Sequence, residues 1–271
     1  MVRVVTLNIW QEQGPHVERL ELIGERMRDL EPDVICLQEV RQLDDRIPNQ
    51  AATLARRLGM SVTYETAQAW GGGDEGLAVL SRLPIVDRDA TELPFTEGRS
   101  RRVCLGAGLD SPEGRFWVFT THLAFRLADG LLREQQVVTL EHFVRAHASS
   151  GASILTGDFN APPDADEIRY LRGLTTLQGQ RVYYQDAFLQ CNPGVPGHTW
   201  TVENPYTSAL GWLEPDRRLD YIFVTPMTRA GAGQIRSCRI VCQQPNPSGI
   251  YCSDHYGLMA EIAAYPPRAQ G

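Results

Sequence analysis

This chain of 271 residues lacks several features, and each absence narrows the class of protein. No apolar run approaches the roughly 20 residues that a membrane-spanning helix needs. No Pro/Ser-rich linker, low-complexity tract or obvious internal repeat divides the chain, so we expect one domain over residues 1–271. The chain begins in a strand pattern rather than a leader sequence, which makes the cytoplasm the default location, although a secreted mature form would look the same.

The cysteines lack the spacing of a metal site. There are six, with no Cys-x-x-Cys pair and no zinc-like spacing to a pair of histidines. Cys36 and Cys104 lie within apolar runs, as small core residues do. A bridge between Cys242 and Cys252 across a turn is conceivable but disfavoured. The sequence therefore indicates a reduced protein without zinc.

Positive charge is also scarce. The 26 basic residues face 33 acidic ones, giving a net charge of −7 and a pI near 5.4. This balance argues against a tight, non-specific grip on nucleic acid, which depends on neutralising phosphates. It does not exclude phosphate chemistry, because carboxylates that bind a divalent cation count as negative here.

What is present is an alternation of helix and strand patterns. Helical spacing covers residues 17–30, 49–58 and 131–147, and a short helix is expected after Pro162-Pro163. Hairpin-paired strands with interspersed helices predict an α/β fold of two mixed sheets packed face to face, with helices outside. The expected strands are 2–7, 34–38, 62–66, 77–81, 85–91, 102–109, 115–121, 153–157, 220–224, 235–241 and 256–263.

Polar side chains follow the apolar runs. Asp158 and Asn160 come directly after the run Ile154-Leu155-Thr156, and strand alternation turns both to the same face. A simple turn would use the same residue types. The pattern recurs, however, at the ends of other runs, which carry Asn8, Glu39, His122, Asp220 and the pair Asp254-His255. Strand ends on a rigid scaffold are common sites of chemistry.

These residue types suit metal-assisted phosphate chemistry. Oxygen donors such as Asn8, Glu39 and Asp254 match a hard cation, Mg²⁺ or Mn²⁺. Asp158 and Asn160 would orient an attacking water. A carboxylate beside a histidine fixes its tautomer, so Asp220 with His255, and Glu75 with His122, are expected pairs.

Six segments resemble the motifs of the endonuclease/exonuclease/phosphatase (DNase I-like) superfamily, and they span nearly the whole chain in that family's order. They are Thr6-Leu7-Asn8, Leu37-Gln38-Glu39, Thr121-His122-Leu123, Gly157-Asp158-Phe159-Asn160, Arg218-Leu219-Asp220-Tyr221 and Ser253-Asp254-His255.

The resemblance implies a four-layer α/β/β/α sandwich of two packed mixed β-sheets with flanking helices, and divalent-metal phosphoester hydrolysis. It assigns Glu39 as the main ligand of Mg²⁺ or Mn²⁺, helped by Asn8 and Asp254. Glu75 matches the acid that partners His122 in DNase I-like members.

The same motifs imply the remaining catalytic roles. Asp158 and Asn160 would position the water and the phosphate. His255, backed by Asp220, would act as a base or as a donor to the scissile phosphate. His122 would contact a phosphate oxygen or assist the leaving group.

Substrate-binding residues are less defined. Arg101 and Arg102 lie just before a strand, where DNase I-like members carry a phosphate-binding arginine, although such a loop can also be a solvated turn. Trp200 and Trp212 could form an aromatic wall for a base or a lipid head group, or simply anchor a loop. Gly71-Gly72-Gly73 has no phosphate-loop context and is expected to be a hairpin tip.

Subfamily patterns leave the substrate open. His122 stands where abasic-site endonucleases have a tyrosine-containing segment, and the tryptophan-containing segments of inositol polyphosphate 5-phosphatases are missing. Asn8-Ile9-Trp10 is similar to the sphingomyelinase branch, whereas His198-Thr199-Trp200-Thr201 is similar to tyrosyl-DNA phosphodiesterases.

The sequence therefore predicts a divalent-metal-dependent phosphodiesterase. Its phosphoester substrate would be nucleic acid, a phospholipid head group or a small nucleotide, with the acidic balance disfavouring long duplex DNA. The alternatives are a phosphomonoesterase of the same fold and an inactive family member that serves as a binding module. No obligate protein partner is indicated.

Overall fold

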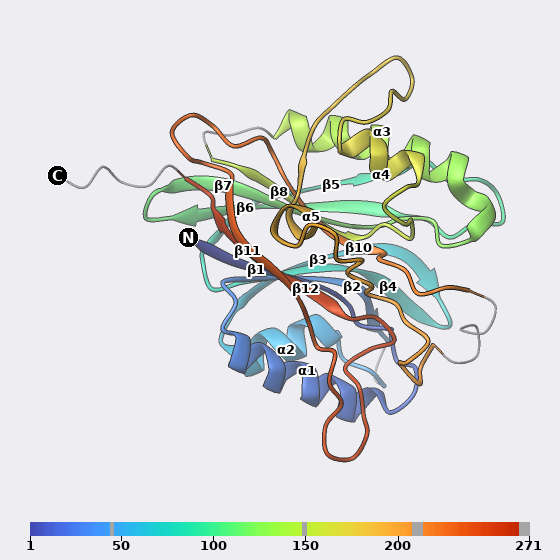
Figure 1. Cartoon of the computed structure of the whole chain (residues 1–271). Helices are drawn as coiled ribbons and strands as arrows, with labels where there is room; N and C mark the ends of the chain where they lie inside the picture. Colours follow the sequence, from blue (N-terminus) through green and yellow to red (C-terminus); the bar gives the residue numbers. More distant parts are fainter. Residues whose placement is uncertain (44–45, 148–150, 208–213, 266–271) are drawn as a thin grey trace.

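The computed structural model describes residues 1–43, 46–147, 151–207 and 214–265. Two six-stranded sheets pack face to face, and helices cover both outer faces, which gives four layers (Figure 1). Helices α1 (His16–Leu30) and α2 (Gln50–Leu58) cover one sheet, and α3 (Gly130–Ala146) and α4 (Asp166–Leu171) cover the other. The predicted α/β sandwich is confirmed, and all four predicted helices are present.

Each sheet has a defined strand order. The first runs β11 (Gln234–Val241), β12 (Gly257–Ala263), β1 (Val2–Asn8), β2 (Val34–Gln42), β4 (Gly73–Ser81) and β3 (Ser61–Trp70). The second runs β5 (Ile85–Glu92), β6 (Val103–Ser111), β7 (Gly114–His122), β8 (Ser153–Asp158), β10 (Asp220–Val224) and β9 (Gln185–Asp186). The two-residue β9, the five-residue α5 (Ala187–Cys191) and the 3₁₀ turn η1 (Leu127–Asp129) are too short for a periodic signal and were not predicted.

The central strands are apolar on both sides because both of their faces are buried. In β1, Val4 faces the core between the sheets, whereas Val5 and Leu7 face the core under α1 and α2. A third core fills the space between the second sheet and α3 and α4. This double burial explains the continuous apolar runs of the sequence.

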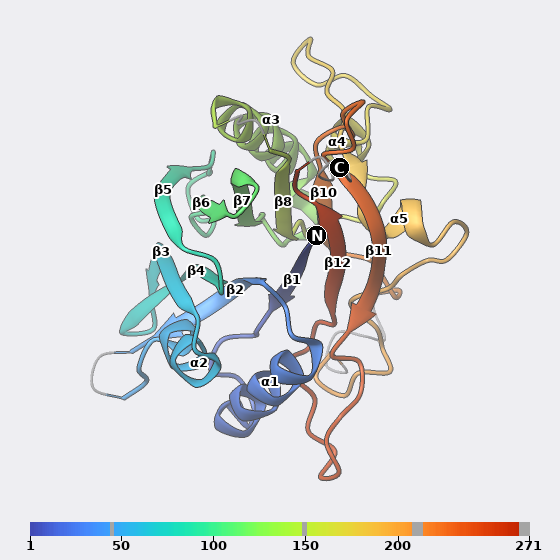
Figure 2. The same ribbon diagram turned by 90° about the vertical axis from the view of Figure 1, so that its left-hand side faces the viewer.

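Chain direction brings the polar strand ends to one edge. β1 is parallel to β2, and β7 is parallel to β8, so their carboxyl ends coincide in pairs. β10 is antiparallel to β8 and β12 is antiparallel to β1, so the segments that precede β10 and β12 arrive at the same edge. Figure 2 shows the two sheets end on, with β1 and β12 beside β8 and β10.

Local signals set the helix ends. The Asn49 side chain accepts the N–H of Ala52 and caps α2, and Gly59 ends the helix in the left-handed conformation. Glu31 adopts that conformation after α1, directly before Pro32. Among the described residues, no helix combines the length and apolar character needed to span a membrane. All six cysteines are free thiols.

Candidate active site

Glu39 reaches the cleft because β2 is irregular at its centre. The register between β2 and β4 shifts between Leu37 and Val40, and Glu39 has a φ of 56°. This region is unfavourable for a residue with a side chain, and such strain is concentrated at functional sites. Asn160, with a φ of 51°, is a second case in the same cleft.

Asn8 lies between two carboxylates. Its Nδ2 donates to Glu39 Oε1 and to Asp158 Oδ2, each at 3.1 Å, while its Oδ1 accepts the N–H of Trp10 at 2.9 Å. The sequence predicted an oxygen ligand of a cation at this position. In this structure that oxygen accepts one backbone hydrogen bond and the amide nitrogen donates to both carboxylates, so the ligand role of Asn8 stays a prediction.

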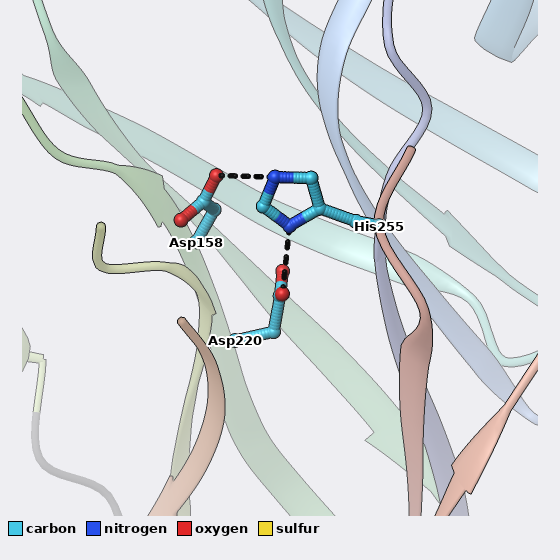
Figure 3. Close-up of side chains that lie close together, drawn as sticks. All are labelled: Asp158, Asp220 and His255. Carbon is cyan, nitrogen blue, oxygen red and sulfur yellow. Dashed lines mark hydrogen bonds and ion pairs between the residues drawn. The ribbon is translucent and has the colours of Figure 1, made fainter. Parts of the chain in front are cut away.

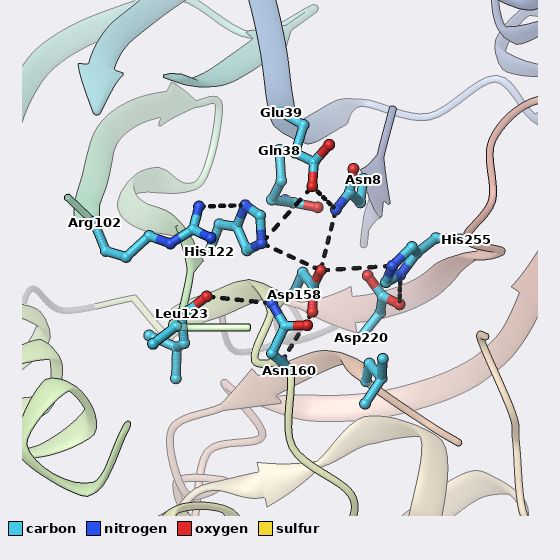
Figure 4. Close-up of polar contacts among 12 residues, drawn as sticks. Asn8, Gln38, Glu39, Arg102, His122, Leu123, Asp158, Asn160, Asp220 and His255 are labelled. Carbon is cyan, nitrogen blue, oxygen red and sulfur yellow. Dashed lines mark hydrogen bonds and ion pairs between the residues drawn. The ribbon is translucent and has the colours of Figure 1, made fainter. Parts of the chain in front are cut away.

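Asp158 is the hub of the site (Figure 4). Its Oδ1 accepts the N–H of Asn160 at 2.9 Å, and its Oδ2 lies 3.5 Å from His122 Nε2 and 3.7 Å from His255 Nε2. Asn160 Nδ2 donates to the carbonyl of Leu123 at 3.2 Å, which ties the end of β8 to the end of β7. The predicted placement of residues 158 and 160 beside each other is what the structure has.

His255 and Asp220 form a buried pair (Figure 3). His255 Nδ1 lies 2.9 Å from Asp220 Oδ2, and its Nε2 points to Asp158. Burial lowers the pKa of His255, but the charges of Asp220 and Asp158 outweigh it and raise that pKa well above the usual value. The predicted pairing of Asp220 with His255 is therefore present.

One ligand atom from each of Asp158, Asp220 and His255 lies within 4.8 Å of the others, close enough to hold an ion. A ligating imidazole must be neutral, however. His255 shares its Nδ1 hydrogen with Asp220, and its raised pKa favours the charged form. The three residues form one hydrogen-bonded group in which Asp220 holds Nδ1 of the ring and Nε2 points to Asp158, so the group can also hold a proton.

His122 has a different partner from the predicted one. The sequence paired it with Glu75, but Arg102 lies between them, with its Nη1 3.0 Å from His122 Nδ1 and 3.6 Å from Glu75 Oε1. An arginine only donates, so Nδ1 accepts and Nε2 carries the hydrogen. Burial, Arg102 and His255 all lower the pKa of His122. The sequence predicted a direct contact between His122 and Glu75, and in the structure Arg102 contacts both of them instead.

The carboxylates that line the cleft have too little positive charge near them to stabilise their ionised forms. Burial raises the pKa of Glu39 to about 8, with Glu75 and Asp254 adding to the effect. Burial likewise raises the pKa of Asp158 to about 6 and shifts that of Asp254 upward. Three acids that resist ionisation in one cleft fit a divalent cation, whose charge would restore the ionised forms. Glu39 and Asp254 have the oxygen donors to hold it.

The cleft has a volume of about 380 Å³ and includes most of the predicted substrate residues. Arg102 and Trp200 line it, with the Arg217 guanidinium 5.1 Å above the Trp200 ring. Arg101 does not line the cleft and pairs with Glu92 at 2.7 Å on the surface, so its substrate role stays a prediction. Trp212 lies outside the described residues.

Eight lining residues were not among the predicted site residues: Gln11, Gln68, Trp70, Ser100, Phe125, Glu214, Arg217 and Leu219. Only Trp70 had a usable signal, because it directly precedes the glycines predicted as a hairpin tip. The prediction of that hairpin is confirmed by the pairing of Trp70 with Gly73.

Comparisons with known proteins agree with this geometry. A model of the endonuclease/exonuclease/phosphatase family matches residues 5–255. Nocturnin of Drosophila melanogaster is 27% identical over 285 residues, which cover 93% of this chain and 43% of that protein. The inositol phosphosphingolipids phospholipase C of Schizosaccharomyces pombe is 26% identical over 182 residues, covering 60% of this chain and 42% of that protein.

A solved structure shows the same fold. Truncated TDP2 of Caenorhabditis elegans matches with a TM-score of 0.74 and 17% identity, covering 97% of each chain. The chain spans less than half the length of the two curated relatives named above. These likenesses define its fold and ancestry rather than its substrate.

Proposed function

The chain belongs to the endonuclease/exonuclease/phosphatase family, and we propose that its cleft hydrolyses a phosphodiester by attack of water, assisted by Mg²⁺ or Mn²⁺. One observation carries this proposal: the buried Asp158 and the half-buried Glu39 and Asp254 line a single cleft with His122 and His255. Phosphoryl transfer depends on positioning and charge stabilisation, without need of a covalent nucleophile.

Glu39 and Asp254 would hold the cation through their carboxylate oxygens. Oxygen donors in small number suit Mg²⁺, which keeps several of its waters. When bound, the cation would neutralise charge on the phosphate oxygens. Asn8 holds Glu39 and Asp158 at a fixed separation by donating to both.

Asp158 and His255 would hold the attacking water and exchange protons with it. Asp158 Oδ2 and His255 Nε2 are 3.7 Å apart, and Asp220 fixes the ring from its other side. A water held between these two atoms has an acceptor and a donor in reach. His122, which carries its hydrogen on Nε2, would donate to a phosphate oxygen.

The shape of the cleft favours a diester over a monoester. Gln68 and Trp70 line it on the side of β3 and β4, and Trp200 and Leu219 line it on the side of β10. The catalytic acids and histidines lie between these two sides of the cleft. The cleft therefore has room for substituents on both sides of a phosphate.

Hydrolysis of bis-p-nitrophenyl phosphate tests the proposal, with p-nitrophenyl phosphate as the monoester comparison. We expect turnover of the diester with Mg²⁺ or Mn²⁺, loss of turnover in EDTA, and a roughly 10²- to 10⁴-fold lower kcat in His255→Ala. His142→Ala, at an exposed histidine of α3, is the matched control. A folded, metal-loaded protein that hydrolyses neither ester would favour a binding module.

A further inference from the structure

Trp70 is an exposed aromatic residue at the mouth of the cleft. It is the last residue of β3, pairs with Gly73 across the hairpin, and is 44% exposed. Gln68 and Trp70 are two positions apart on one strand, so their side chains point to the same face. Both line the cleft.

A buried arginine covers one face of the Trp70 ring. The Arg41 guanidinium lies 4.7 Å from the ring centroid, and its side chain is completely buried. Arg41 Nε donates to Glu12 at 3.1 and 3.0 Å, and its Nη2 donates to the carbonyl of Gly71 at 3.2 Å. These bonds fix the guanidinium, and the cation–π contact holds the indole ring against it. The opposite face of the ring is therefore the exposed one.

Two glutamine side-chain amides line the same cleft as the Trp70 ring. Gln11 Nε2 and Gln68 Nε2 both donate to Glu75 Oε2, at 3.0 and 3.1 Å. Both glutamines also line the cleft. With their nitrogens engaged, their carbonyl oxygens are the groups that can accept hydrogen bonds from a ligand. A planar ring with amino groups at its edge matches this combination of a flat apolar face and polar acceptors.

We propose that Trp70 is a stacking platform for a nucleobase, and that the substrate is a nucleotide phosphodiester. This inference rests on the proposed function, because it names the substrate class of the same cleft. A base gains from a rigid ring plane, and its stacking on an aromatic side chain corresponds to roughly 5- to 150-fold in affinity. An acyl chain has no plane that this arrangement would match, and a choline group would be a second cation on a ring that already holds the Arg41 guanidinium.

Two ligands that differ mainly in the base test the proposal. Adenosine 5′-monophosphate, with its 3′ isomer, is compared with ribose 5-phosphate by isothermal titration calorimetry in Mg²⁺. In the wild-type protein we expect an AMP isomer to bind roughly 5- to 150-fold more tightly than ribose 5-phosphate. Trp70→Ala should reduce that ratio to within about twofold, and Trp70→Phe should retain most of it. Tyr183→Ala, at an exposed tyrosine outside the cleft, should leave the ratio unchanged.

The outcomes separate this inference from the proposed function. Equal binding of AMP and ribose 5-phosphate, or a ratio that survives in Trp70→Ala, would overturn the stacking role. So would loss of binding to sphingomyelin vesicles, rather than to AMP, in Trp70→Ala. Turnover of bis-p-nitrophenyl phosphate is measured on the same samples. Absence of this turnover would contradict the proposed hydrolysis. The ratio of AMP binding to ribose 5-phosphate binding would still test the stacking role of Trp70.

Discussion

His122 and His255 are both buried in one cleft, yet their neighbours shift their pKa values in opposite directions. Burial and Arg102 lower the pKa of His122, whereas Asp220 and Asp158 raise that of His255 against the effect of burial. One ring is therefore a neutral donor and the other a charged one. Groups whose environments separate their pKa values can take different roles in one reaction.

Asp220→Asn tests the dependence of His255 on its partner. An amide keeps the shape but not the charge, so the pKa of His255 should fall and its tautomer should no longer be fixed. We expect kcat to fall by roughly 10²- to 10⁴-fold with a smaller change in KM, and the pH–rate profile to shift towards acid. Steady-state kinetics across pH measure this.

Asp166→Asn is the control for that variant, since Asp166 is an exposed acid in α4 that pairs only with Arg169 among the contacts described. It should leave kcat unchanged. A kcat of Asp220→Asn within twofold of the wild-type value would show that Asp220 has no part in the reaction.

Arg19 ties the loop after β1 to the His255 loop. The side chain is 1% exposed and donates to five backbone carbonyls, which belong to Ile9, Trp10, Gln11, Gln13 and Cys252. Removal of the guanidinium would leave buried acceptors without donors.

We therefore expect Arg19→Met to lower the free energy of unfolding by roughly 3 kcal/mol or more. In thermal unfolding this is a fall in Tm of roughly 6 °C or more. Arg28→Met, at an exposed position of the same helix, should change Tm by much less. Similar Tm values for both variants would show that these bonds do not support the loop.

At the scale of elements, the close approach of β7 and β8 depends on Gly157. It has a φ of 145°, and a Cβ there would lie 2.1 Å from the carbonyl oxygen of Thr121. Glycine alone fits this conformation without strain. The residue directly before Asp158 therefore lets the end of β8 lie against the end of β7, where His122 is.

Gly157→Ala should consequently cost roughly 3 kcal/mol or more in the free energy of unfolding and displace Asp158. Denaturant unfolding and diester turnover should both show the loss. Gly24→Ala is the matched control, because Gly24 is inside α1 and an added Cβ would meet Leu54 at an ordinary 3.7 Å. That variant should be neutral or slightly stabilising. Equal stabilities of the two variants would contradict the steric argument.

Element prediction succeeded where one residue pattern decided one element. The apolar runs predicted the central strands because both faces of those strands are buried. The pattern could not show the shift in β2 that turns Glu39 into the cleft, since a bulge depends on the partner strand. It also could not show that Arg102 separates Glu75 from His122, because that contact joins distant strands.

At the scale of the whole molecule, folding brings several acids into one cleft without enough positively charged side chains beside them to stabilise their ionised forms. The folded protein holds the proton of Glu39 up to a pH of about 8, whereas the unfolded chain releases it near its ordinary value of 4.5. In that window the folded state binds more protons, so the free energy of unfolding falls as pH rises. The raised pKa of His255 has the same effect: above 6.5, its ordinary value, it also makes the free energy of unfolding fall as pH rises. A bound cation would replace those protons.

Thermal unfolding across pH, with and without Mg²⁺, tests this linkage. In EDTA, Tm should fall as pH rises from about 6.5 to about 9, through the pKa of Glu39 at about 8. Mg²⁺ should raise Tm, and more so at the alkaline end, because protons compete with the cation for Glu39. Glu39→Gln should reduce the pH dependence in EDTA to the part that His255 contributes, and it should weaken the Mg²⁺ effect. A Tm in EDTA that stays level or rises over this range would contradict the raised pKa of Glu39, and an Mg²⁺ effect unchanged in Glu39→Gln would contradict its assignment to the cation site.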